Sequence, residues 1–223
     1  MTRSREHEEV LAELAERLSV AHLHYRERKQ RAESMAVRWE WFTESQVEIE
    51  PFGKLRRGSK LGRRVRNPRK PDGKVHVGVD GAGQIWCERL YQALGWHFES
   101  FVFPGIDVVE QWLYSYNSTR AVRVDVPYAP LPDRAACWVK RHDSSHGVPR
   151  WTAEVAFDSL RWEEYLHRNG RLEEIVGWSR VRAGGLAGVE HDTRAVIQYD
   201  ELGVFRIENH FDGEYCGEWC RPI

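Results

Sequence analysis

The sequence has few cysteines and no long apolar run. The four cysteines in its 223 residues are Cys87, Cys137, Cys216 and Cys220. They are too few for the disulfide framework typical of small secreted proteins. No stretch reaches the roughly 18 uncharged apolar residues that span a bilayer, and the first thirty residues lack the apolar centre of a signal peptide. We therefore expect a cytoplasmic protein with reduced thiols and no membrane partner.

The net charge is also close to zero, because the sequence has 33 basic and 34 acidic residues, which sum to −1. This average hides a strong segregation. Residues 54–74 contain ten basic residues and one acidic residue, a charge of +9, which leaves 23 basic and 33 acidic residues, or −10, elsewhere. With 41% hydrophobic and 30% charged residues the composition is that of a globular domain, and we treat residues 1–223 as one domain.

The N-terminal part has a helical pattern. Apolar residues recur at spacings of three and four, which places them on one face of a helix: Leu11, Leu14, Leu18, Ala21 and Tyr25. The pattern predicts one long helix over residues 6–33, with Ser4 as its N-cap. We expect its apolar face to pack against a sheet.

After the helix the apolar period changes to two. Val37, Trp39 and Trp41 predict one strand, and Val47 with Ile49 predicts another. From residue 75 onward, turn sequences separate alternating runs: Asp80-Gly81-Ala82-Gly83, Pro104-Gly105, Asn169-Gly170 and Asp200-Glu201-Leu202-Gly203. We expect an α+β fold in which an antiparallel β-meander of about eight to twelve strands, curled or two-layered, follows the helix.

Three parts of this meander are less regular. Val122, Val124 and Val126 alternate as a strand does. Residues 137–140 are expected to pair with residues 151–157 across a loop at 142–146. Residues 159–174 fit either a strand hairpin or a capped helix, and the Asn169-Gly170 turn favours the strands.

Two hairpins align 120 positions apart, with Asp80 matching Asp200 and Gly83 matching Gly203. Aspartate hydrogen-bonds forward to the backbone, and glycine adopts the left-handed conformation that returns the chain. The segment Tyr199-Asp200-Glu201-Leu202-Gly203 resembles the repeat unit of YD-repeat (RHS-type) β-meander proteins. The resemblance implies serial antiparallel strands and an association with bacterial toxin or immunity systems, and it supplies no catalytic residues.

The basic segment 54–74 is the main candidate binding site. Its cations could contact phosphates or an acidic partner: Lys54, Arg56, Arg57, Lys60, Arg63, Arg64, Arg66, Arg69 and Lys70. The segment has no interleaved aromatic residues, so it does not itself predict base reading. The alternative is a solvated loop whose charge offsets the acidic remainder of the chain.

Metal binding and catalysis have weaker signals. Cys216 and Cys220, with His210 upstream, or Cys137 with His142 and His146, could contribute zinc ligands, but a second close pair is missing. We therefore expect no cofactor and no metal. The run His142-Asp143-Ser144-Ser145-His146 collects a base, a carboxylate and hydroxyls. Four carboxylates in the predicted strands could line a pocket: Glu88, Glu99, Asp125 and Glu208.

These observations favour a non-enzymatic binding or immunity-like protein with a protein partner. A nucleic-acid-associated protein that uses residues 54–74 is the first alternative, and an enzyme with an unrecognised site is the second. Trp39 and Trp41 lie two residues apart on one predicted strand, so they share a face. They could therefore form a binding platform, although tryptophans are more often core residues.

Overall fold

The computed structural model of the chain describes residues 4–57, 62–66, 68–91, 96–117, 135–156, 159–181 and 188–221. Its helical elements are α1 (Arg5–Ser19), the 3₁₀ turn η1 (Ala21–His24), α2 (Tyr25–Met35) and the short α3 (Gly53–Arg56). The strands are β1 (Arg38–Phe42), β2 (Arg64–Val65), β3 (Val75–Val79), β4 (Ile85–Tyr91), β5 (Trp96–Pro104), β6 (Val108–Asn117), β7 (Ala135–Ser145), β8 (Val148–Ala156), β9 (Ser159–Arg168), β10 (Arg171–Val181), β11 (Glu190–Asp200), β12 (Gly203–Phe211) and β13 (Glu214–Cys220).

Over these residues the strands form one antiparallel sheet in the order β13-β12-β11-β10-β9-β8-β7-β6-β5-β4-β3-β1-β2. From β3 to β13 each strand pairs with the next one along the chain, so the expected antiparallel meander is confirmed. At the N-terminal end of the sheet the order differs, because β1 lies between β3 and β2 and β2 forms the edge. The thirteen strands exceed the eight to twelve expected.

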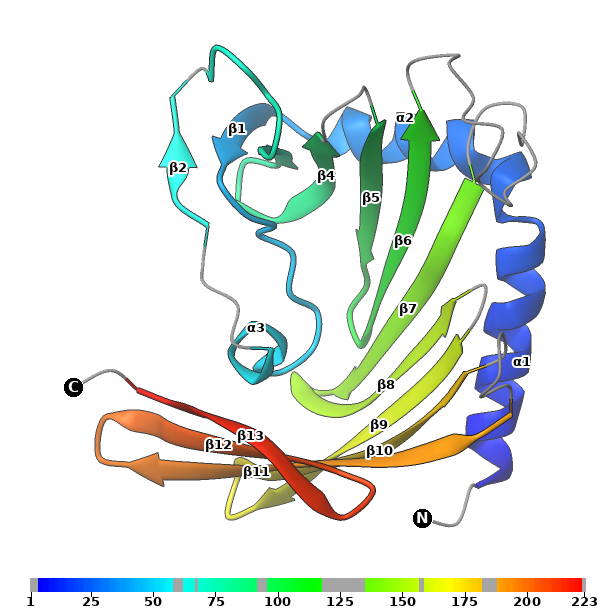
Figure 1. Cartoon of the computed structure of the whole chain (residues 1–223). Coiled ribbons are helices and arrows are strands. Elements are labelled where there is room, and N and C mark those ends of the chain that lie inside the picture. The colour runs from blue at the N-terminus through cyan, green and yellow to red at the C-terminus, as the bar shows by residue number, and fades with distance from the viewer. Residues whose placement is uncertain are drawn as a thin grey trace.

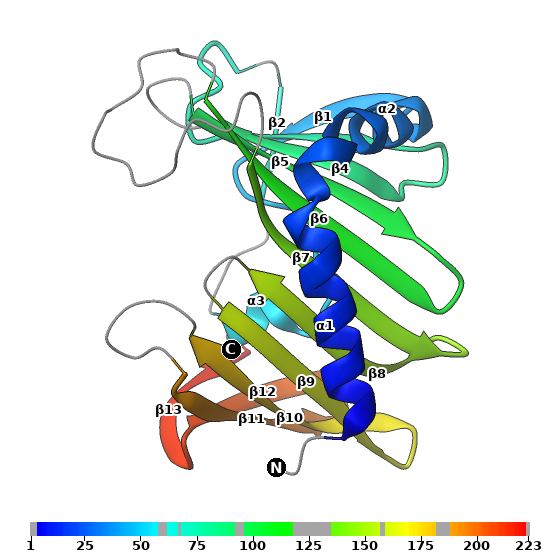
Figure 2. The same ribbon diagram turned by 90° about the vertical axis from the view of Figure 1, so that its right-hand side faces the viewer.

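The sheet is curled into an open trough, with α1 and α2 on its outer side and α3 inside it (Figure 1). Viewed from the outer side, α1 crosses the sheet over β7 and β8 (Figure 2). The outer face is apolar, and its core includes Leu14 of α1, Trp112 of β6 and Trp162 of β9. Because side chains alternate along a strand, the residues between these apolar positions face the inside of the trough.

The expected single helix over residues 6–33 is confirmed only in part. Ser4 caps α1, since its hydroxyl accepts a hydrogen bond from the backbone N–H of His7. The α-helix stops at Ser19, and the chain changes direction through η1 before α2 begins (Figure 2). The Ala21 carbonyl accepts hydrogen bonds from Tyr114 Oη and Arg28 Nη1, both at 3.1 Å. These side chains satisfy a carbonyl that a continuous helix would pair internally.

The strand expected at Val47 and Ile49 is wrong. Residues 45–49 have no strand partner and cross the inner face of the sheet before α3. The backbone N–H groups of Gln46 and Val47 donate to the Glu88 carboxylate at 2.5 and 2.9 Å. A buried side chain therefore takes the place of a neighbouring strand. The basic segment 54–74 likewise includes the end of α3 and all of β2.

The meander differs from expectation in one hairpin and agrees in another. The loop expected at residues 142–146 is a strand as far as Ser145, and only His146 and Gly147 form the turn, with φ of 52° and 77°. The strands of the hairpin pair as expected, with Val139 opposite Val155. Residues 159–174 belong to β9 and β10, so the helical alternative is wrong. The strand expected at residues 122–126, and Asp125 with it, lies outside the described residues.

The expected turn chemistry is confirmed. Asp80 Oδ1 accepts hydrogen bonds from the backbone N–H of Ala82 and of Gln84, each at 2.9 Å. Asp200 Oδ1 accepts one from Leu202 at 2.8 Å. Asn169 and Gly170 both have positive φ, 52° and 74°, as a two-residue hairpin requires. In the part of the chain that the structure describes, the helices are too short and too polar to cross a membrane.

Candidate functional site

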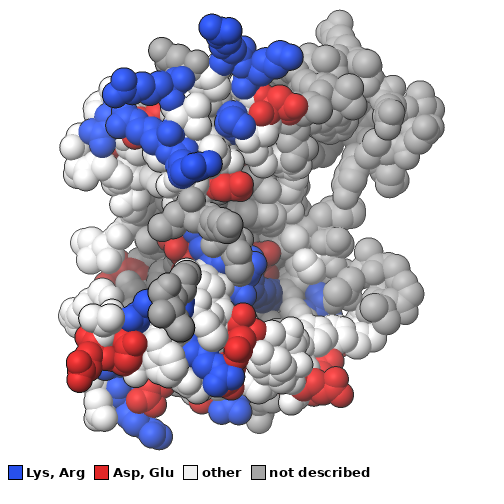
Figure 3. Space-filling view, turned by 60° about the vertical axis from the view of Figure 1, so that its left-hand side comes forward, with Lys and Arg blue, Asp and Glu red and all other residues white. Residues whose placement is uncertain are grey.

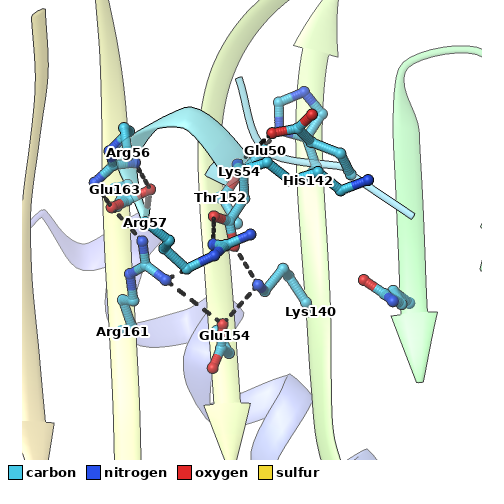
Figure 4. A network of polar contacts seen from close by, with 12 residues as sticks. Glu50, Lys54, Arg56, Arg57, Lys140, His142, Thr152, Glu154, Arg161 and Glu163 are labelled. Atoms are coloured by element: carbon cyan, nitrogen blue, oxygen red, sulfur yellow. Dashed lines mark hydrogen bonds and ion pairs between the residues drawn. The ribbon is translucent and has the colours of Figure 1, made fainter. Parts of the chain in front are cut away.

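Charged side chains fill the inner face of the trough where residues 45–57 lie against β7, β8 and β9 (Figure 4). Glu163 of β9 is 1% exposed. Its carboxylate accepts two hydrogen bonds from Arg56, at 2.6 and 3.0 Å, and one from Arg161 at 2.5 Å. Burial would raise the pKa of Glu163, but the charges of Arg161 and Arg56 outweigh it and hold that pKa below its usual range. The carboxylate is therefore ionised and bridges α3 to the sheet.

Glu50 forms a second buried junction. Its carboxylate pairs with Lys140, and with Arg57 at 3.1 Å and Arg161 at 3.7 Å. Burial would raise the pKa of Glu50, but the cations Lys140 and Arg161 lower it far below its usual range. Lys140 also pairs with Glu154 of β8 at 2.8 Å. These pairs join the crossing segment to three successive strands.

Glu88 of β4 fixes the start of the same segment. Besides the two backbone N–H groups already described, its carboxylate accepts a hydrogen bond from the Ser45 hydroxyl at 2.7 Å. Burial raises the pKa of Glu88 in spite of these donors and of the nearby Lys54 charge. The inner face is thus occupied by the protein's own chain over residues 45–57.

This arrangement divides the nine basic candidates of the sequence. Lys54 is 7% exposed, the Arg56 side chain is 11% exposed, and Arg57 forms an ion pair with Glu50. Lys60 lies outside the described residues. The other five are all exposed: Arg63, Arg64, Arg66, Arg69 and Lys70. The structure therefore places the external positive charge around β2 and the chain that leads into β3.

Figure 3 shows Lys and Arg side chains gathered at the upper end of the molecule, the end that carries β1 and β2 in Figure 1. Exposed Arg38 of β1 belongs to this end as well. Glu40 is the one carboxylate found in ion pairs here over the described residues, with Arg38 and Arg64 at 3.2 and 3.1 Å. Cations exceed acids, so this surface attracts anions.

The outer face of the same strands carries a row of aromatic rings. Trp41 of β1 stacks on His76 of β3, with ring centroids 4.1 Å apart and planes 10° from parallel. Trp39 lies 4.8 Å from His76, and Trp41 lies 5.5 Å from Tyr91 of β4. We call these four half-buried residues the aromatic row. Burial, and then the charge of Arg89, lowers the pKa of His76, so its imidazole is neutral at pH 7.

The aromatic row and the exposed cations are adjacent. Val65 of β2 lies directly opposite Trp41, so β2 borders the row. Arg38 and Arg64 pair with Glu40, which lies between the two tryptophans along β1 and therefore faces the other side of the sheet. On the other side, α2 packs against β4 and β5, and the Arg89 Cζ lies 4.6 Å from the centre of the Trp39 ring. Positive charge therefore lies on both sides of the row, with Arg89 at Trp39 and the residues around β2 beside Trp41. The sequence suggested Trp39 and Trp41 as a platform; the structure adds His76 and Tyr91.

The histidine-rich run does not form a catalytic cluster. His142 faces the inside, where Nδ1 lies 2.9 Å from Thr152 Oγ1, and burial lowers its pKa. Asp143, the next strand residue, faces the other side of the sheet. Ser144 donates to the Asp107 carbonyl at 3.2 Å. His142 and Asp143 therefore lie on opposite faces of the sheet, and the Ser144 hydroxyl is used by the Asp107 carbonyl, so these three groups do not converge on a common reactant.

The remaining candidate carboxylates and thiols are also dispersed. Glu99 accepts hydrogen bonds from Tyr25 and Arg89 on the outer face, whereas Glu208 pairs with Arg206 on β12. Cys216 and Cys220 are exposed on β13. Over the described residues there is no group of three or more potential metal ligands.

Comparison with known proteins gives no relative: no family model, no curated protein and no solved structure matches the chain. The resemblance of its hairpins to YD repeats therefore stays a prediction. The site has to be interpreted from its own residues, and these present two distinct regions. The inner face is occupied by residues 45–57, while the half-buried aromatic row lies on the outer face at the end of the sheet that carries the exposed cations.

Proposed function

We propose that this chain is a binding protein and that it binds single-stranded nucleic acid on the outer face of β1, β3 and β4. One observation carries the proposal: the aromatic row and the exposed cations around β2 meet at the same end of the sheet. Unpaired bases stack on aromatic side chains, while cations neutralise the phosphates beside them. A solvated loop of balancing charge would not require an aromatic surface next to it.

The chemistry favours binding with little sequence preference. Stacking on an aromatic ring is available to every base, and arginine contacts to phosphate carry no sequence information. A duplex hides its base faces, so it can use the cations but not the aromatic row. We therefore expect a single strand to bind more tightly than a duplex of the same sequence.

The test is fluorescence anisotropy with labelled single-stranded and duplex oligonucleotides. Because stacking contributes about 1–3 kcal/mol per base, Trp41→Leu should weaken single-strand binding by about 5- to 150-fold. Replacing Arg63 and Arg66 together by Gln should lower affinity and reduce the salt slope by about 1.4, since each single-strand phosphate contact contributes about 0.7.

A matched control replaces two exposed arginines at a distance from the row, Arg150→Gln with Arg168→Gln, whose side chains are 51% and 77% exposed. Equal loss in the control and in the Arg63/Arg66 variant would show only a net-charge effect and refute the site. Tighter binding of the duplex would also refute the proposal. Circular dichroism and thermal unfolding establish that each variant is folded.

The protein partner expected from the sequence is a second candidate, and the open end of the sheet favours it. Among the described residues β13 pairs only with β12, which leaves its outer edge available for another strand. Tyr215 on this strand is 56% exposed. A pull-down from the native cell should lose its captured protein with Tyr215→Asp. Capture of the same protein by both forms would argue against β13 as the contact.

A further inference from the structure

The break between α1 and α2 creates a hollow against β5 and β6. Its volume is about 360 Å³, within the range of small-ligand sites. Its lining includes Arg17, Arg28, Arg31, Phe103 and Trp112. The hollow lies beside η1, so it is separate from residues 45–57 and from the aromatic row. At this break the Ala21 carbonyl accepts hydrogen bonds from Tyr114 Oη and Arg28 Nη1.

Aromatic rings fix two of these guanidinium groups in place. The Arg28 Cζ lies 3.8 Å from the centre of the Trp112 ring, and the Arg31 Cζ lies 4.9 Å from the centre of Phe103. Arg28 Nη1 also donates to Tyr114 Oη at 2.6 Å. A guanidinium that lies on a ring keeps its N–H groups at its edge, where they can donate to a ligand.

Only some of the charged side chains that line the hollow are in ion pairs. Arg17 is neutralised by Glu110, with two hydrogen bonds of 2.7 and 2.8 Å. Glu27, the other acid of the lining, lies 3.4 Å from His24 in an exposed contact. Among the described residues Arg28 contacts the Ala21 carbonyl, the Tyr114 hydroxyl and the Trp112 ring, and Arg31 lies on Phe103; neither is found in an ion pair there. Two fixed guanidiniums without counter-ions therefore share one concave site.

We propose that this hollow binds the phosphate group of a small ligand. Arginine binds phosphate through two parallel N–H···O bonds, and both Arg28 and Arg31 line the hollow. Phe103 and the 41% exposed Val20 supply an apolar wall, which fits a phosphomonoester with an organic body better than inorganic phosphate. The site is independent of the nucleic-acid proposal because no residue is shared.

Calorimetric titration of the full chain with three probes tests the inference: uridine 5′-monophosphate, uridine and inorganic phosphate. The monophosphate should bind and uridine should not. Phosphate should bind more weakly than the monophosphate; equal affinity would instead identify free phosphate as the ligand of the same site. Because a charge-assisted arginine contact is strong, Arg31→Gln should weaken monophosphate binding by about 10- to 150-fold.

Two further variants keep the result specific. Arg31→Lys retains the charge but loses the paired N–H geometry, so its affinity should lie between those of the wild type and Arg31→Gln. Arg168→Gln, at the far hairpin between β9 and β10, should leave binding unchanged. Equal binding of uridine and its monophosphate, or unchanged binding by Arg31→Gln, overturns the inference. Single-strand binding by Arg31→Gln should be unaffected, which separates this site from the aromatic row.

Discussion

The buried carboxylate of Glu163 permits the most direct test of how residues 45–57 are held. Glu163→Gln preserves the shape of the side chain but removes the counter-ion of Arg56 and reduces that of Arg161. Removing one partner of a buried ion pair costs about 3–5 kcal/mol. A chain of this length loses about 2–4 °C of Tm per kcal/mol, so we expect a decrease of about 6–20 °C.

Urea unfolding followed by tryptophan fluorescence measures this loss, and thermal unfolding by circular dichroism gives the shift in Tm. Glu173→Gln is the matched control, because its carboxylate is 42% exposed and lies 3.6 Å from Arg168. An exposed pair of this kind contributes about 0–1 kcal/mol. A loss below about 1 kcal/mol in Glu163→Gln would refute the conclusion that buried pairing holds the segment in place.

Three other predictions concern the rest of the fold. The pKa of Glu50 is lowered in the folded state, so its contribution to stability is complete above its ordinary pKa of 4.5 and is lost as pH falls below that value. In Glu50→Gln the free energy of unfolding should therefore fall less steeply between pH 5 and pH 2, and an unchanged pH dependence in this range would contradict the prediction. Leu14→Ala empties a fully buried position of α1 and should cost about 2–5 kcal/mol in urea unfolding, whereas a change below about 1 kcal/mol would show that α1 is not anchored there. Gly170→Ala, at φ 74°, should cost about 1–2 kcal/mol, and a stabilised variant would argue against the left-handed turn.

Much of the sheet could be predicted from the sequence because turn residues act locally. Asp80, Asn169 and Asp200 each begin a turn that needs only its own neighbours, and all three turns are found. The break in the N-terminal helix could not be predicted in the same way. At the break the Ala21 carbonyl accepts a hydrogen bond from Tyr114, which lies 93 residues away in the sequence.

The candidate sites were predicted less well, and the reason is a property of strands. Alternation of period two separates the faces of a strand but does not say whether the polar face meets solvent or the inside of a curved sheet. The segment Arg161-Trp162-Glu163 therefore resembles an ordinary half-exposed strand. Its excess of charge becomes informative only once the matching cations of α3 are placed beside it.

The crossing segment also has a consequence for how the chain folds during synthesis. Arg56 and Glu163 are 107 residues apart, and Lys140 and Glu50 are 90 apart. Residues 45–57 thus leave the ribosome long before the strands that receive them. Contacts of such separation form late and slowly. Residues 45–57 should therefore dock onto the sheet only after β9 has been made.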